Sequence, residues 1–301
     1  MSLSSSKEPS LSAPNPAFVA SGPRLPDEAE LHETFICPRS GWVPVDWAEL
    51  YRGRELLFFL VWRDVKVRYK QTVLGVAWAA LQPLLTLVVF TVIFGRYAGI
   101  PSEGFPYPVF AFAALLPWTF FANGVAQAGQ SLVSQQQLLT KVYFPRVFIP
   151  TATVGAFLLD FAISLVLFAL LMAGYRVVPS WQVVFVPFLI ALTVMATLGM
   201  GYLLAALTVF YRDFRYVVPF LIQILMFLSP VIYPLNILPT PYRWFLALNP
   251  MAGVIEAYRS AILGTPWDLP ALAISSVVCF VLFMTGLSYF RKVERWFADF
   301  A

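Results

Sequence analysis

Residues 74–94 read LGVAWAALQPLLTLVVFTVIF, a stretch with no charged side chain. A helix of this length rises by about 30 Å, which matches the hydrocarbon thickness of a bilayer. The rest of the chain has the same character, since 59% of its 301 residues are hydrophobic and only 12% are charged. Soluble domains carry about 45–50% apolar and about 25% charged residues. The sequence therefore predicts an all-α polytopic membrane protein and excludes a soluble globular domain.

Further apolar segments give a total of six predicted transmembrane helices within a domain over residues 73–290. They are expected near 74–94, from 108 to 126–131, and over 147–173, 181–210, 217–233 and 269–290. Six spans place both termini on one side. Basic residues concentrate in 52–70, in the loops 127–146 and 211–216, and in the tail 291–301, whereas the opposite loops hold only Arg96, Arg176, Arg243 and Arg259. By the positive-inside rule, both termini are expected in the cytoplasm.

The chain ahead of the first span divides into two parts. Residues 1–45 are rich in serine and proline and show little periodicity, which predicts a disordered cytoplasmic tail. Residues 46–72 combine apolar residues at helical spacing with lysines and arginines, which predicts an amphipathic helix in the plane of the lipid headgroups. The alternative is an amphipathic helix that packs on protein.

The segment between the last two predicted spans is apolar and interrupted by prolines. Two short helices are expected, near 242–248 and 250–263, because Pro250 suits a first helical position. Apolar helices too short to span predict re-entrant or interfacial segments on the outer face, over residues 235–264. The alternative is an extracellular loop that folds back on the bundle.

Motifs for enzymatic chemistry are absent from the sequence. There is no GxxxxGK[ST] phosphate loop, no GxSxG and no HExxH, and His32 is the only histidine. Asp160 is the one acid expected within a span, and it either bonds to a neighbouring helix or lines a polar path. Gln82, Gln127 and Gln223 are interpreted as interhelical hydrogen-bonding residues or as substrate contacts. No catalytic residue, metal site or nucleic-acid surface is expected.

The loop at 134–146 mixes polar residues with exposed apolar and aromatic ones and ends at a proline. A solvated loop has no need of Leu138, Leu139, Val142, Tyr143 and Phe144. The pattern favours a short helix that presents an apolar and basic face to a cytoplasmic partner. Docking of this segment on the bundle is the alternative.

Six motifs in order resemble one family. They are RDVKVRYKQTVLG at 63–75, LLPW at 115–118, KVYFPR at 141–146, RDFRY at 212–216, LNP at 248–250 and EAYR at 256–259. The chain, over about residues 46–290, resembles the membrane-spanning (permease) subunits of bacterial ABC exporters for O-antigen, capsule and teichoic-acid polysaccharides. The resemblance implies an inner-membrane homodimer, with a translocation path between its two subunits, that moves a lipid-linked polysaccharide out of the cytoplasm. It also implies two copies of a separate cytoplasmic ATPase, which would hold ATP and Mg²⁺ while this chain binds no cofactor, and a periplasmic conduit would be a further partner.

The resemblance also implies roles for four groups of residues. The ATPase-coupling group is Gln137, Leu138, Lys141, Val142, Tyr143, Phe144 and Arg146. The group at the cytoplasmic entrance, for the carrier headgroup or for anionic lipid, is Arg63, Lys66, Arg68 and Lys70. Channel-lining candidates, with an interfacial aromatic belt as the alternative for the aromatic ones, are Trp118, Phe121, Asp160, Phe227 and Tyr233. The outer gate is expected to include Trp244, Asn249, Pro250, Glu256 and Arg259.

Other functions fit parts of the sequence. A related permease for drugs or lipids would share the six-span plan. An intramembrane lipid-sugar transferase would need clustered acids that the spans lack, and a passive envelope scaffold would leave the outer helices and the coupling segment unexplained.

Overall fold

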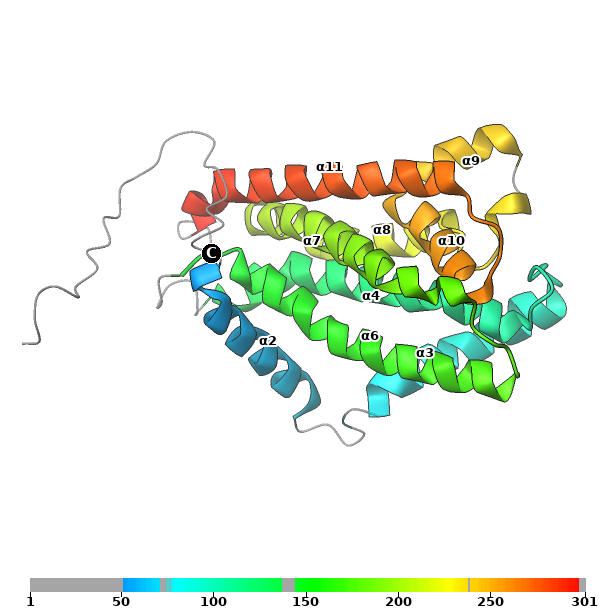
Figure 1. Ribbon diagram of the computed structural model, residues 1–301. Coiled ribbons are helices and arrows are strands. Elements are labelled where there is room, and N and C mark those ends of the chain that lie inside the picture. Colours follow the sequence, from blue (N-terminus) through cyan, green and yellow to red (C-terminus); the bar gives the residue numbers. More distant parts are fainter. Residues whose placement is uncertain (1–50, 71–74, 76, 137–143, 238, 298–301) are drawn as a thin grey trace, which may run out of the picture. The chain divides into compact units, whose positions relative to one another are not determined.

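The computed structural model describes residues 51–70, 75, 77–136, 144–237 and 239–297, and within these ranges it contains helices and turns but no strand (Figure 1). The predicted tail 1–45 and the first residues of the predicted helix 46–72 lie outside the described residues. The prediction of an all-helical protein is confirmed for the part of the chain that the structure describes.

Five of the described helices are long and apolar enough to cross a membrane. Each contains 21 to 30 residues, so each rises by at least about 30 Å. They are α3 (Ala77–Phe90) with its π-helical continuation η3 (Thr91–Tyr97), α4 (Tyr107–Ser134), α6 (Phe148–Gly174), α7 (Val186–Phe210) with the preceding turn η4 (Trp181–Phe185), and α11 (Leu269–Val293). These helices correspond to the first four predicted spans and the last one.

The predicted span at 217–233 is shorter in the structure. Helix α8 covers Phe214–Leu228, and its 15 residues rise by only about 22 Å. The helix ends because Pro230 restricts the residue before it, and Ser229 is accordingly extended, with ψ of 146°. Six continuous spanning helices are therefore not observed among the described residues.

Contacts along their lengths show that α7 and α11 run parallel. Phe185, just before α7, meets Trp267, just before α11, and Phe210 at the far end of α7 meets Phe297. Residues 211–268 must therefore return the chain from one end of the bundle to the other, and α8 is part of that return (Figure 1).

The two parallel helices touch backbone to backbone where glycines face each other. A Cβ atom on Gly199 would lie 2.6 Å from the backbone nitrogen of Phe283, and one on Gly286 would collide with the carbonyl oxygen of Gly199. Small residues permit this approach, as they do between membrane helices generally. Helix α4 contacts α3, α6, α7 and α10, and much of the core is formed by its buried side chains.

Between α8 and α11 the structure contains a short turn η5 (Leu235–Ile237) and two short helices, α9 (Thr240–Ala247) and α10 (Pro250–Leu263). The α10 bounds match the prediction, and the Asn249 side chain caps its first turn by accepting a hydrogen bond from the Met251 backbone. Every residue of α10 is buried, in contact with α4, α7 and α11. This packing agrees with the alternative of a segment folded on the bundle.

Helix α2 (Arg54–Tyr69) lies along the first half of α6. Leu60 of α2 is buried against Phe148 and Ala152, and Val61 occupies the space that Gly155 leaves free. Phe58 and Trp62 stay exposed. The packed-on-protein alternative therefore describes one side of α2, while its exposed aromatic residues still agree with a lipid contact.

Candidate functional site: a polar cavity between four helices

An ion pair joins the end of α2 to the middle of α6. The Arg68 guanidinium donates to Asp160 Oδ2 at 2.8 Å, and the Tyr69 hydroxyl donates to Asp160 Oδ1. The Arg68 guanidinium also lies 3.6 Å above the Phe157 ring. Burial, followed by the hydrogen bond to Asp160, raises the pKa of Tyr69 well above its usual value, so Tyr69 keeps the proton that it donates.

The sequence reasoning missed this partner of Asp160. The residue pattern over 46–72 predicts an interfacial helix but does not predict which helix its last turn contacts. Because α2 runs along the first half of α6, its last turn reaches the middle of that longer helix (Figure 1). The acid is therefore paired rather than isolated, which lowers the cost of placing it in a membrane helix.

Asp160 also lies on the wall of a cavity of about 760 Å³. Four helices and the turn before α3 contribute to the wall. The lining residues include Asp64, Arg68 and Tyr69 from α2, Trp78 and Gln82 from α3, Asn123, Gln127, Ser131 and Ser134 from α4, and Thr153, Phe157 and Asp160 from α6. Pockets of 300–1,000 Å³ are typical of small-molecule sites.

A second, smaller cavity of about 60 Å³ continues the first. Both cavities are lined by Gln82, Asn123 and Asp160, and the smaller one extends to Thr119 and Ser164. The two together form a polar groove along α4. We use "polar groove" below for these two cavities and their lining residues.

The polar groove follows a regular spacing in the sequence. On α4 the polar residues recur every fourth position, which places them on one face of a helix. They are Thr119, Asn123, Gln127, Ser131 and Gln135, the last just past the helix end. On α6, Thr153, Asp160 and Ser164 share a second polar face. This i, i+4 pattern is readable from the sequence, yet of the groove residues the sequence analysis names only Arg68, Gln82, Gln127 and Asp160 as candidates.

The other candidates for the cytoplasmic entrance lie on α2. Arg63 pairs with Asp64 at 2.8 Å and donates to Gln135 Oε1 at 2.6 Å, so it links α2 to the end of α4. Lys66 lies 5.3 Å from the Trp62 ring, and Lys70 is exposed. Two of the four predicted cations are thus engaged within the protein, and the headgroup role of the set stays a prediction.

The aromatic channel-lining candidates do not gather at the groove. Trp118 and Phe121 are buried in the core of the bundle, with ring centroids 5.8 Å apart. Phe227 is exposed on α8, and Tyr233 is half-buried beyond that helix. Of the five candidates, only Asp160 lies on the groove.

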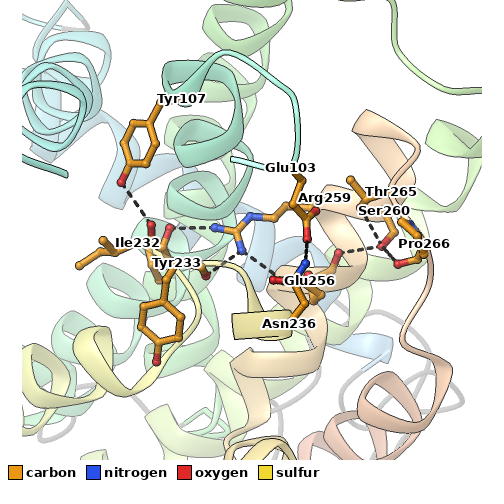
Figure 2. A network of polar contacts seen from close by, with 11 residues as sticks. Glu103, Tyr107, Ile232, Tyr233, Asn236, Glu256, Arg259, Ser260, Thr265 and Pro266 are labelled. Carbon is orange, nitrogen blue, oxygen red and sulfur yellow. Dashed lines mark hydrogen bonds and ion pairs between the residues drawn. The ribbon is translucent and has the colours of Figure 1, made fainter. Parts of the chain in front are cut away.

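Two of the outer-gate candidates, Glu256 and Arg259, belong to a polar network at the opposite end of α4, shown in Figure 2. Arg259 of α10 is fully buried, lies 3.8 Å above the Phe110 ring and donates to Glu256 Oε2 at 3.2 Å. Its guanidinium also donates to the backbone carbonyls of Val231 and Tyr233, at 2.9 and 3.2 Å. Arg259 therefore supplies hydrogen bonds to the turn after α8, and its pairing with Glu256 holds this turn against α10. The outer-gate role of the two residues stays a prediction.

Two more outer-gate candidates contribute to the same junction. The Asn249 Nδ2 group donates to Ser229 Oγ at 2.8 Å, and Pro250 is buried at the start of α10. Tyr107 of α4 donates to the Ile232 carbonyl at 3.2 Å (Figure 2). The side chain of Trp244 lies outside the described residues.

With this geometry in view, comparison with known proteins identifies the family. The family profile described as "ABC-2 type transporter" matches residues 55–263. The chain belongs to the ABC-2 type transporter family.

Relatives within this ABC-2 type transporter family carry specific names. The chain is 34% identical over 258 residues to the O-antigen export system permease protein RfbA of Myxococcus xanthus. This alignment covers 83% of the chain and 97% of that relative. It is 27% identical over 246 residues to RfbA of Klebsiella pneumoniae, covering 81% and 94%. It is also 26% identical over 241 residues to the polysialic acid transport protein KpsM of Escherichia coli, covering 77% and 91%. The resemblance to polysaccharide-export permeases is confirmed.

Most of the coupling group predicted from the sequence lies outside the described residues. Gln137, Leu138, Lys141, Val142 and Tyr143 lie outside the described residues. Phe144 is half-buried and packs beside α2 and the start of α6.

Arg146 ties the start of α6 to the chain beyond α11. Its backbone N–H donates to Glu294 Oε1 at 2.9 Å, and its guanidinium donates to the Glu294 carbonyl. Burial raises the pKa of the Glu294 carboxyl, and Arg291 and Arg146 oppose that rise. The last two members of the predicted coupling group, Phe144 and Arg146, are therefore anchored to α2, to the start of α6 and to the chain just beyond α11.

Proposed function

We propose that this chain is the transmembrane subunit of an ATP-driven exporter that moves a lipid-linked cell-surface polysaccharide from the cytoplasm across the inner membrane. One observation carries the proposal: the similarity to permeases named for O-antigen export and polysialic acid transport covers 97% and 91% of the lengths of those relatives. The polar groove supports it, because a hydrophilic cargo needs polar groups within the span of the bilayer.

The proposal includes six crossings with both termini in the cytoplasm. The parallel course of α7 and α11 supports an even count, since the chain must return between them. Helix α8 is too short to cross alone, and the non-helical residues after it would complete the passage where α10 and Arg259 shield their backbone from lipid. The basic residues near the helix ends support the orientation.

Two copies of the chain and two copies of a separate ATPase would form the complete exporter, with ATP and Mg²⁺ on the ATPase. Closure of the ATPase pair would push the segment at 135–146, which joins α4 to α6. Both helices contribute residues to the lining of the polar groove. A push that moves α4 relative to α6 would change the groove, provided that the ATPase contacts differ between the two states.

Deletion of the gene in its own host tests the proposal. We expect polymer to disappear from the cell surface and to accumulate inside the cell, and plasmid-borne expression of this chain to restore surface polymer. Unchanged surface polymer in the deletion strain would refute polysaccharide export. ATP hydrolysis or lipid-sugar transfer by the purified chain alone would refute the assignment as a transport subunit.

A further inference from the structure

The polar groove contains side-chain amides with no partner in the described part of the chain. Gln82 of α3 and Asn123 and Gln127 of α4 line it, and within the described residues their side-chain amides make no hydrogen bond. The hydroxyl groups on the same walls differ, since Thr86 and Ser131 donate to backbone carbonyls of their own helices. An amide can donate two hydrogen bonds and accept two. Three such groups within predicted spans therefore call for a polar occupant of the groove.

The ionised groups of the groove are already balanced. Arg68 is held by Asp160 at 2.8 Å, and Asp64 is held by Arg63 at the same distance. A phosphate or pyrophosphate is recognised by cations that are free to form charge-assisted hydrogen bonds. The groove instead offers neutral amides beside the aromatic side chain of Trp78. Neutral sugars suit this chemistry, because their hydroxyl groups both donate and accept while their ring C–H faces stack on aromatic rings.

The shape of the groove favours a chain of sugars over a single compact ligand. Polar positions extend on α4 from Thr119 to Gln135, which is about 24 Å along the helix axis. The larger cavity lies toward the end of the bundle that carries Gln135, and the smaller one leads from Asn123 to Thr119. Successive contacts along one helix face match a repeating, extended occupant.

We propose that the polar groove binds consecutive neutral sugar residues of the exported chain, with Gln82, Asn123 and Gln127 as the hydrogen-bonding residues. This inference rests on the proposed function and deepens it, since it assigns sugar recognition to a groove within one subunit. The Arg68–Asp160 pair forms the wall of this site and is not available to a carrier phosphate.

Leucine substitutions test the assignment in cells. Asn123→Leu and Gln127→Leu replace the amide with an apolar side chain that a membrane helix tolerates. Gln130→Leu is the matched control, because Gln130 lies on α4 but does not line the groove. Loss of one neutral hydrogen bond corresponds to about a fivefold effect. We expect each groove variant to export polymer about fivefold more slowly at equal protein level, and the control to match the wild type. Equal rates in all three variants would overturn the inference.

A photo-crosslinking experiment identifies the occupant directly. The photoreactive residue p-benzoylphenylalanine replaces Gln127 in the full chain in cells that make the polymer, and exposed Val277 of α11, away from the groove, serves as the control position. We expect ultraviolet light to yield protein adducts that stain for carbohydrate at position 127 only, and none in cells blocked in polymer synthesis.

Other adducts at position 127 would overturn the inference in distinguishable ways. An adduct of two copies of the chain would mean that the amides bond across a subunit interface. An adduct with phospholipid alone would mean a lipid headgroup site. Neither result touches the proposed function, which is tested separately by surface polymer in the deletion strain.

Discussion

The Arg68–Asp160 ion pair is expected to fasten α2 to α6, and its removal should release α2. Asp160 accepts from both Arg68 and Tyr69, so Asp160→Ala removes two hydrogen bonds, one of them with full charges on both partners. The two side chains keep 27% and 24% of their surface exposed, which places the pair between surface pairs of about 0–1 kcal/mol and buried pairs that cost about 3–5 kcal/mol to break. We expect a loss of about 2 kcal/mol in the docking of α2.

A loss of this size changes the undocked population about 30-fold. Where undocking is fast compared with cleavage, the rate of proteolysis follows that population. Trypsin cleavage after Lys66 and Lys70, measured on the purified full chain, should therefore accelerate about 30-fold in Asp160→Ala. Arg54→Ala is the control, because Arg54 lies on α2 over the Tyr51 ring and, within the described residues, makes no hydrogen bond or ion pair with α6.

A double-mutant cycle separates the pair from general damage to the fold. Arg68→Ala and Asp160→Ala together should cost clearly less than the sum of the two single changes, since each single change already removes the pair. A coupling energy below about 0.5 kcal/mol, or equal cleavage rates in Asp160→Ala and Arg54→Ala, would refute the fastening role.

Three further predictions concern other parts of the molecule. Arg259→Met should lower the folded yield strongly, since it leaves buried Glu256 without its cation at a cost of about 3–5 kcal/mol. Size-exclusion chromatography would reveal the aggregated protein, and a wild-type elution profile would contradict the structural role of the Arg259–Glu256 pair. Gly286→Ala should destabilise by about 1–3 kcal/mol in thermal unfolding, whereas Gly174→Ala, with open space around it, should not. Tyr143→Ser should reduce co-purification of the ATPase at unchanged membrane level, and an intact complex would exclude the coupling role.

Apolar length and proline positions allowed much of the fold to be predicted. The span at 181–210 and the helix at 250–263 match the observed bounds, because an uninterrupted apolar run and a first-position proline are local signals. The 217–233 span was overestimated, since hydropathy counts Ser229 and Pro230 only weakly although they end the helix. Local signals thus predict the positions of helices better than they predict the residues at which helices end.

Pairings between distant helices could not be predicted in the same way. Arg68 and Asp160 are 92 positions apart, and their contact depends on the course of α2 along α6. Arg259 and Glu256 were selected as gate residues from a motif, yet their burial follows from the packing of α10 among α4, α7 and α11. The polar residues that α4 contributes to the groove are the exception, because their four-residue spacing is visible in the sequence alone.

The glycine contact between α7 and α11 has a mechanical consequence. Where two backbones touch, no deformable side chains lie between them. Helices α7 and α11 should therefore move together as one rigid unit. Helix α3 is the opposite case, since among its residues only Pro83, Leu87 and Phe90 are buried. Conformational changes that admit cargo would then be concentrated in α3, which would move relative to the packed pair of α7 and α11.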